Sequence, residues 1–388
     1  MQAQLSKDDL YSKLLTGAHR IGSVAEQEIL DAEKNNSISQ NVVDAIVEEG
    51  FNRLIIPKEY GYPQIDFTTF SQLIKTVGYY NLSAAWVTYF YALHNSWVAL
   101  LPKHRMDQIY EDGGLLTDIF APMGHLQDVE GGFILNGKWN FVSGINHSKW
   151  VAVGALYKFA DSDIPAHVLL CLDVDDIEVL QDWDPLGLRG SGSNTIIVKD
   201  LFVPFDMMID LRQIIVHRKP ANLEISEDYL YFNVPFFPAF FIGFPSMAIG
   251  AAERVVDEFI TRTKNRVRPD GTNEGQTPKG QRVAAELTLK LKGAKGLLYQ
   301  YIEMLDSDVG QYSLAEYNAI RVQIIKDCVQ IAVRATSALG AGALKRGSAL
   351  EVMLRDLIAI STHVTSLYED GIDYFGKSLF DVEHKSRG

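Results

Sequence analysis

The spacing of hydrophobic residues changes twice along the chain. Up to about residue 115, apolar side chains recur at helical intervals. From about 113 to 203 they form short runs broken by Gly, Asp and Pro, which is typical of strands. Helical spacing then returns. The expected helices are Val42–Glu49, Phe67–Val77, Ser83–Leu101, Gly250–Phe259, Arg282–Leu305, Ser313–Leu339 and Leu350–Tyr368. The pattern predicts an α+β protein with a helical domain over residues 1–115, a β-domain over 116–215 and a helical bundle over 216–388.

Two apolar runs are long enough to be compared with membrane spans. The run Ala84–Leu101 is interrupted at its centre by the triplet His-Asn-Ser, and Tyr231–Ala252 contains three prolines. A membrane-spanning helix needs about 20 apolar residues without such interruptions. We therefore expect both runs to be buried in a large core, and we expect no membrane attachment.

Composition narrows the class of protein. The chain has 388 residues and a net charge of −13, so its field repels nucleic acid and anionic membrane surfaces. Its two cysteines, Cys171 and Cys328, are far apart and form no metal-ligand spacing, so we expect no metal site. The N-terminal segment lacks the apolar core of a signal peptide. These features predict a cytoplasmic protein with reduced thiols.

One hairpin is the most informative segment. Residues 137–150, GKWNFVSGINHSKW, indicate a strand, a turn and a second strand, with aromatic side chains around a single Ser-Gly step. Strand alternation is expected to place Trp139, Phe141 and Ser143 on one face. A strand face with two aromatic side chains and one hydroxyl group is suited to bind a flat, redox-active ring. Taken alone, the segment is equally compatible with a hydrophobic hairpin that has a turn hydroxyl.

Four further motifs, in this order and at this spacing, resemble the acyl-CoA dehydrogenase superfamily over nearly the whole chain. They are DPLGLRGSGS (184–193), GFPSMAIGAAERVVDEF (243–259), RATSALGAGAL (334–344) and MLRDL (353–357). The resemblance implies an acyl-CoA dehydrogenase-like fold: an N-terminal helical domain, a central β-barrel or sandwich that binds flavin, and a C-terminal four-helix bundle. It also implies a homotetramer, arranged as a dimer of dimers.

The dehydrogenase branch of this superfamily needs a glutamate base in one of two places. The first place matches Val364, and the second falls near Phe240, in a stretch from Asn233 to Ala252 without Asp or Glu. Because a positioned base must remove the α-proton, this absence counts against dehydrogenation. A dehydrogenase or oxidase with a relocated base, and a flavin-binding homologue that has lost catalysis, remain as alternatives.

The chain resembles a second branch, the two-component flavin-dependent monooxygenases, which include oxygenases acting on p-hydroxyphenylacetate, dibenzothiophene and steroid phenols. The resemblance lies in the Trp139–Trp150 motif, in Leu93–Trp97, and in Arg355-Asp356 followed by His363. It implies that a separate flavin reductase supplies reduced FMN or FAD, and that a C4a-hydroperoxyflavin hydroxylates an aromatic substrate or oxidises a heteroatom in a small aromatic or heterocyclic one.

The resemblance also assigns roles to individual residues. Ser143 is expected to donate a hydrogen bond at the flavin N5, although a turn serine bonding its own backbone has the same sequence. His363 is expected to be a general base or hydrogen-bonding group at the cavity, on one helical stripe with Ile360 and Leu367, where a plain core histidine is the alternative. His94 is the third candidate catalytic residue, and its alternative is a buried histidine with local partners.

Binding residues complete the predicted site. The expected flavin contacts are Trp139, Phe141, Ser143, Gly144, Arg189, Ser191 and Arg262. The expected substrate contacts are His94, Asn95 and Phe240. For Arg189 and Ser191 the alternative is a crossover loop that needs glycine for its turns, and for Arg262 it is a solvated helix face.

Overall fold

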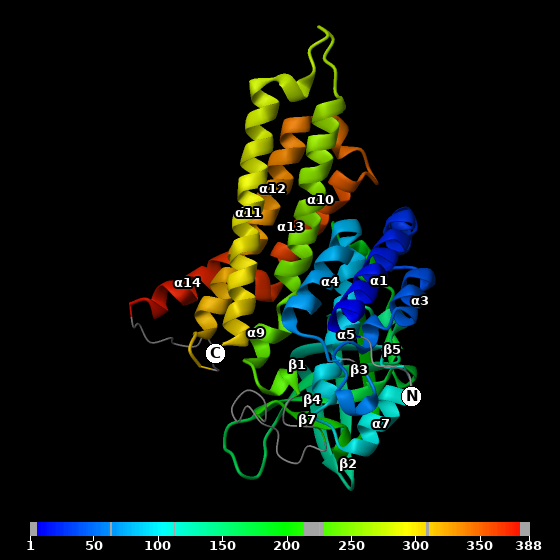
Figure 1. Cartoon of the computed structure of the whole chain (residues 1–388). Coiled ribbons are helices and arrows are strands. Elements are labelled where there is room, and N and C mark those ends of the chain that lie inside the picture. Colours follow the sequence, from blue (N-terminus) through cyan, green and yellow to red (C-terminus); the bar gives the residue numbers. More distant parts are fainter. Residues whose placement is uncertain are drawn as a thin grey trace.

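The computed structural model describes residues 6–380, except 63, 112, 213–224, 226–228 and 308–309. Figure 1 shows three long helices, α10, α11 and α12, standing above a β-domain, with the N-terminal helices beside the lower part of the bundle. The predicted boundary between 115 and 116 coincides with the start of the first strand at Leu116. The predicted boundary between 215 and 216 lies outside the described residues.

The N-terminal part is helical and is organised around a buried apolar helix. Its helices are α1 (Lys7–Gln27), α2 (Ile29–Asn35), α3 (Gln40–Glu48), α4 (Phe67–Tyr80), α5 (Leu82–Leu93), α6 (Asn95–Val98) and α7 (Lys103–Glu111). All twelve residues of α5 are buried, which explains why its sequence is a continuous apolar run rather than an amphipathic one. The expected helix Ser83–Leu101 is interrupted at His94, where α5 ends and the short α6 begins.

The central part is a seven-stranded mixed sheet. Its strands are β1 (Leu116–Val129), β2 (Gly132–Val142), β3 (Trp150–Tyr157), β4 (Ala166–Asp173), β5 (Glu178–Val179), β6 (Asn194–Pro204) and β7 (Met208–Asp210), in the order β5-β6-β2-β1-β3-β4-β7. Only the β1–β3 pair is parallel among these described strands. The pairing of β2 with β6 shifts register between Trp139 and Val142, and this irregularity shapes the site described below.

The C-terminal part is a bundle of antiparallel helices. It contains α9 (Phe236–Phe240), α10 (Gly243–Asn265), α11 (Pro278–Asp306), α12 (Leu314–Leu339), α13 (Ala349–Ser361) and α14 (Tyr368–Ser378). The stretch Phe236–Asn265 could cross a membrane by length and hydropathy alone, but 83% of its most apolar window is buried inside the protein. Burial of this kind is typical of a core helix.

The expected continuous helix Leu350–Tyr368 is wrong. Helix α13 ends at Ser361, and a single 3₁₀ turn, η10 (Val364–Ser366), connects it to α14. The ring of His363 accepts a hydrogen bond from the backbone N–H of Thr365, so this side chain caps the new turn. The β-branched residues around it favour leaving the helix as well.

A close contact between the glycine-rich loop 183–193 and α13 holds the three parts together. A Cβ atom on Gly187 would lie 2.2 Å from the carbonyl oxygen of Arg355. The next residue, Leu188, donates its N–H to the carboxylate of Asp356 at 2.7 Å. The guanidinium of Arg355 donates to the carbonyl of Leu186 at 2.6 Å and to Glu33 in the N-terminal part at 2.8 Å. We call this contact the loop–α13 clamp.

A buried polar pair connects the α5–α6 junction to the first strand. His94 bonds the carbonyl of Leu116 through Nδ1 at 3.1 Å, and its Nε2 lies 3.1 Å from Oδ2 of Asp118. Burial lowers the pKa of His94 to about 3 and raises the pKa of Asp118 to about 8. At neutral pH both groups are therefore uncharged, and Nε2 of His94 lies against the carboxyl without a hydrogen-bond partner among the described residues. Trp97 donates its indole N–H to the same carboxyl at 3.0 Å.

Replacing Gly187 with alanine tests the loop–α13 clamp. Because the added Cβ meets backbone atoms of α13 rather than a mobile side chain, Gly187→Ala should lower the free energy of unfolding by about 1–3 kcal/mol. Gly293→Ala is the matched control, since a Cβ in that exposed helical position meets nothing within 4 Å. The control should leave stability unchanged or raise it by up to about 1 kcal/mol. Urea unfolding measures both, and equal effects would contradict the clamp.

Replacing Asp118 with asparagine tests the buried pair. The folded-state pKa of Asp118, about 8, lies above its ordinary value of 3.8, so the folded protein keeps a proton that the unfolded chain has lost. The stability contributed by this group is therefore lost as the pH rises toward 8. Relative to wild type, Asp118→Asn should remove a decline on the order of 1 kcal/mol per pH unit between about pH 4 and 8. Urea unfolding at several pH values measures the difference.

The exposed Asp163 supplies the control for that experiment. Its side chain is fully exposed, so Asp163→Asn should leave the pH dependence of stability as it is in the wild type. Parallel pH curves for Asp118→Asn and wild type would show that the carboxyl is not protonated in the folded protein.

Candidate active site

A cavity of about 810 Å³ lies where the β-domain, α5 and the end of α13 meet. Its walls come from β1, from the end of β2, from the glycine-rich loop and from the segment that follows α13. The volume is in the range of small-molecule sites, and most of the lining is apolar. Phe141, Ser143, Ser191 and His363 are the predicted site residues that the structure brings together here.

A chain of hydroxyl groups forms one wall of this cavity. The indole N–H of Trp86 donates to the Oγ of Ser143 at 2.9 Å, and this Oγ lies 2.7 Å from the Oγ of Ser193. Ser193 lies 2.7 Å from the hydroxyl of Ser191 in turn. The hydroxyl of Ser143 is therefore held by groups far away in sequence, unlike a turn serine that bonds only its own backbone.

The end of β2 shows why Phe141 faces the cavity. The register shift between Trp139 and Val142 breaks the alternation of the strand, and Phe141 takes a positive φ of 68°. The residue is 68% exposed, and its ring packs edge-on against Trp183, which also lines the cavity. The prediction that Trp139, Phe141 and Ser143 share one face is wrong for Trp139. That indole is fully buried and donates to the carbonyls of Ala121 and Gly154.

His363 reaches the cavity from the end of α13. Its ring packs edge-on against Trp86, with centroids 5.5 Å apart, and is tilted against the ring of Phe244 at 5.1 Å. Burial, helped by the positive charge of Arg321, lowers the pKa of His363 to about 4. The imidazole is therefore neutral near pH 7. Nδ1 accepts the backbone N–H of Thr365 at 3.3 Å and lies 2.9 Å from the hydroxyl of Thr365, which can donate to it as well. In that tautomer the proton of the neutral ring lies on Nε2.

Several predicted residues lie outside this cavity. His94, Asn95 and Phe240 are buried together in the core, where Phe240 stacks on the His94 ring at 6.1 Å and the amide of Asn95 donates to backbone carbonyls. Their expected contact with substrate finds no support in this geometry. Trp139 belongs to the core of the β-domain. The predicted hairpin over 137–150 is wrong, because β1 lies between β2 and β3 in the sheet and these two strands do not pair. Gly144 lies in the connection between β2 and β3 with φ 77°, and its carbonyl accepts the hydroxyl of Tyr91 at 2.6 Å.

The two predicted arginines also point to other partners. Arg189 forms ion pairs with Asp184 at 2.7 Å and with Glu33 at 3.8 Å, and it donates to the carbonyl of Pro185. These contacts of Arg189 hold the glycine-rich loop in place. Arg262, near the end of α10, is paired with Glu258 one turn earlier. Neither side chain lines the cavity.

Sequence reasoning missed Trp86 and Trp183, which both line the cavity. Trp86 lies in a helix that is buried on every side, so periodicity gives no sign of the face it presents. Trp183 precedes the glycine-rich motif, and its indole N–H donates to the carbonyl of Leu188 at 3.0 Å. Its position next to that motif is the one signal that pointed to it.

Comparison with known proteins shows what the chain is similar to. The family model for the acyl-CoA dehydrogenase C-terminal domain matches residues 242–366. The oxygenase component of p-hydroxyphenylacetate 3-hydroxylase from Acinetobacter baumannii is 27% identical over 91% of this chain and 85% of its own length. The oxygenase subunit HsaA of a flavin-dependent monooxygenase from Rhodococcus jostii is 25% identical over 91% and 94%. Indole-3-acetate monooxygenase from Pseudomonas putida is 26% identical over 70% and 67%.

Solved structures agree on the fold. XiaF from a Streptomyces species, in complex with FADH₂ and glycerol, superposes with a TM-score of 0.88 at 20% identity and covers 97% of each chain. Butyryl-CoA dehydrogenase from Megasphaera elsdenii superposes with a TM-score of 0.79 at 14% identity, over 98% of this chain and 100% of that one. The chain therefore has the acyl-CoA dehydrogenase fold and, as its motifs predict, is a homologue of the oxygenase components of flavin-dependent monooxygenases.

Proposed function

We propose that the protein is the oxygenase component of a two-component monooxygenase that uses reduced flavin and O₂ to hydroxylate a small aromatic compound or oxidise its heteroatom. The carrying observation is the hydroxyl of Ser143, held by Trp86 and Ser193 on the wall of a large apolar cavity. The names of two relatives, which act on p-hydroxyphenylacetate and indole-3-acetate, support an aromatic substrate.

The residues that line the cavity fit a flavin ring. An aromatic side chain that is 68% exposed within a concave wall, as Phe141 is, offers a flat apolar surface for a planar tricycle. Ser143, Ser191 and Ser193 offer hydroxyl groups along its edge. When bound, the reduced flavin supplies the electrons that activate O₂. Whether FMN or FAD is used is left open, and neighbours in complex with FADH₂ and with FMN are both known.

Ser143 and His363 both act as hydrogen-bond donors in this proposal. Because the indole of Trp86 already donates to Ser143, the serine is left to donate its own proton to Ser193 or to a bound ligand. The neutral imidazole of His363 carries its proton on Nε2 and accepts through Nδ1. Two fixed neutral donors stabilise developing negative charge on oxygen without burying a net charge. The apolar walls limit the access of water.

A missing carboxylate separates this proposal from dehydrogenation. Among the described residues that line the cavity, none is Asp or Glu. Val364, which occupies the place of the common glutamate base, lies on the cavity wall as an apolar side chain. An acyl-CoA dehydrogenase would need a carboxylate here, because the α-proton must be removed by a base within hydrogen-bond reach.

The same proposal includes a partner protein, a cellular location and an oligomeric state. A separate flavin reductase delivers the reduced flavin, as the term oxygenase component implies for the relatives. Both cysteines are buried and free, which fits the reducing cytoplasm in which we place the protein. We propose a homotetramer, which light scattering can measure.

Replacing Ser143 with alanine tests the proposed function. Reduced FMN or FAD is added anaerobically to the full chain and O₂ is then admitted, while release of hydrogen peroxide is recorded. The wild type should bind one of the two flavins and release peroxide more slowly than free flavin does. Loss of a hydrogen bond to a charged group costs about 1.5–3 kcal/mol, so Ser143→Ala should release peroxide about 10- to 100-fold faster.

Ser148→Ala is the matched control. Ser148 belongs to the same connection between β2 and β3 but donates to the carbonyl of Gly144 at 3.0 Å and does not line the cavity, so its loss should leave peroxide release near the wild-type rate. Failure of the wild type to bind either reduced flavin, or equal behaviour of the two serine variants, would refute the proposed role.

A further inference from the structure

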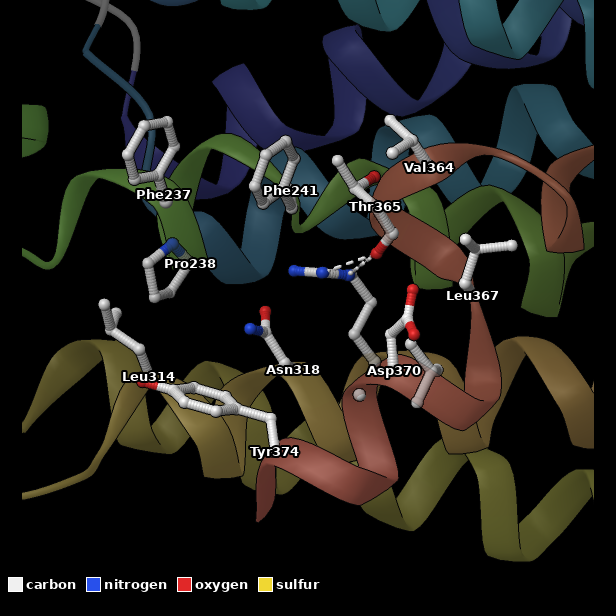
Figure 2. Close-up of a pocket in the computed structure, with 13 residues that line it drawn as sticks. Phe237, Pro238, Phe241, Leu314, Asn318, Val364, Thr365, Leu367, Asp370 and Tyr374 are labelled. Carbon is white, nitrogen blue, oxygen red and sulfur yellow. Dashed lines mark hydrogen bonds between the residues drawn. The ribbon is translucent and has the colours of Figure 1, made fainter. Parts of the chain in front are cut away.

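A second cavity, of about 530 Å³, adjoins the first one behind the η10 turn. Its walls come from α9, α12, η10 and α14, and aromatic residues Phe237, Phe241 and Tyr374 line it (Figure 2). The side chains of Val364 and Leu367 line both cavities. The wall between them therefore consists of side chains of a short connecting segment rather than of a packed helix.

Arg321 from α12 places a buried positive charge in this second cavity. The residue is 3% exposed, and its guanidinium lies over the ring of Phe241, 4.7 Å from the centroid. Nε and Nη2 both donate to the carbonyl of Thr365, at 3.2 and 2.6 Å, as the dashed lines in Figure 2 mark. Nη1 has no hydrogen-bond partner among the described residues. The hydroxyl of Tyr301 lies beside the guanidinium but donates to the carbonyl of Pro238.

Such an arrangement is costly unless a ligand completes it. A buried charge that lacks a counter-ion pays a desolvation penalty of several kcal/mol, and a guanidinium stays protonated in proteins. Arg355 illustrates the ordinary solution in this chain, because it pairs with both Glu33 and Glu351. Arg321 instead keeps the two N–H groups of Nη1 without a hydrogen-bond partner among the described residues, in a cavity large enough for a small molecule.

The lining indicates the kind of anion. Asp370 also faces this cavity, so the site offers one arginine and one acidic residue and suits a single negative charge better than a phosphate dianion. The aromatic and proline side chains favour a flat apolar body attached to that charge (Figure 2). A planar carboxylate matches the geometry of a guanidinium N–H.

We propose that Arg321 binds the carboxylate of a small aromatic acid, whose ring extends past Val364 and Leu367 toward the first cavity. The proposal rests on the proposed function in one respect, namely that this acid is the substrate of the oxygenase. The binding site itself is defined by Arg321 and its cavity, and it requires no flavin.

Binding to the flavin-free full chain tests the site. Isothermal titration compares phenylacetate and 3-phenylpropionate with their uncharged amides. The wild type should bind at least one acid, with its amide at least about 10-fold weaker, which corresponds to about 1.4 kcal/mol. Arg321→Met should weaken binding of the acid about 10- to 100-fold and leave the amide nearly unchanged. Arg334→Met is the matched control on the same helix, because that exposed arginine pairs with Glu286, and it should bind as the wild type does.

The outcomes separate the two proposals. Equal affinity of acid and amide for the wild type, no binding of either acid, or wild-type affinity in Arg321→Met overturns the anion site. If Arg321→Met is unfolded by circular dichroism, Arg321→Lys and the comparison of acid with amide on the wild type still decide. If the wild type does not bind reduced flavin, the proposed oxygenase function is refuted, but the result for the anion site at Arg321 still holds. If the anion site is refuted, the result of the flavin experiment still holds.

Discussion

The cavity depends on the close approach of one loop backbone to one helix backbone. At Gly187 the glycine-rich loop comes so near to the carbonyl of Arg355 that no side chain fits between them. Two charged neighbours in sequence fix that approach, since Asp356 accepts the N–H of Leu188 and Arg355 reaches both the loop and Glu33. Burial raises the pKa of Asp356 to about 7, because the carboxyl is shielded from water at this contact. The glycine-rich loop and α13 contribute residues to the cavity wall, and α2 supports them through Glu33. Loosening this contact would therefore displace the loop and α13 together and open the cavity.

The described lining of the first cavity holds no carboxylate, and this suits its chemistry. Its histidine is neutral, and the hydroxyl groups of its three serines are linked in one chain. Of the charged side chains, the exposed Lys138 lines the cavity, whereas Arg189, Arg355 and Arg321 form a second layer outside the lining. Charges in that second layer stabilise loops and bias pKa values while the reacting space itself stays apolar.

The sequence predicted the fold, and some of the site residues it indicated line the cavity while others do not, for a physical reason that is clear. Ser143 and His363 were found because they belong to motifs whose spacing survives in the chain. The role of His94 stays a prediction, because a histidine in an apolar helix looks the same whether it faces a ligand or, as here, the carboxyl of Asp118 on a neighbouring strand. Phe141 faces the cavity as predicted and Trp139 does not. Strand alternation could not predict this difference, because it does not reveal the register shift between Trp139 and Val142. Trp86 and Arg321 depend on tertiary contacts that no local pattern encodes.

The two cavities are coupled electrostatically, and the direction of that coupling can be derived. The charge of Arg321 contributes to the low pKa of His363, so an anion bound at Arg321 would cancel part of this effect and raise the pKa. Burial, however, is the larger cause and persists when a ligand binds. Starting from about 4 and retaining the burial contribution, the imidazole stays below its ordinary value of 6.5 and remains neutral near pH 7 with or without the anion. Its Nε2 hydrogen is therefore available as a donor in both states, and occupancy of the second cavity changes where a substrate lies without changing which proton His363 carries.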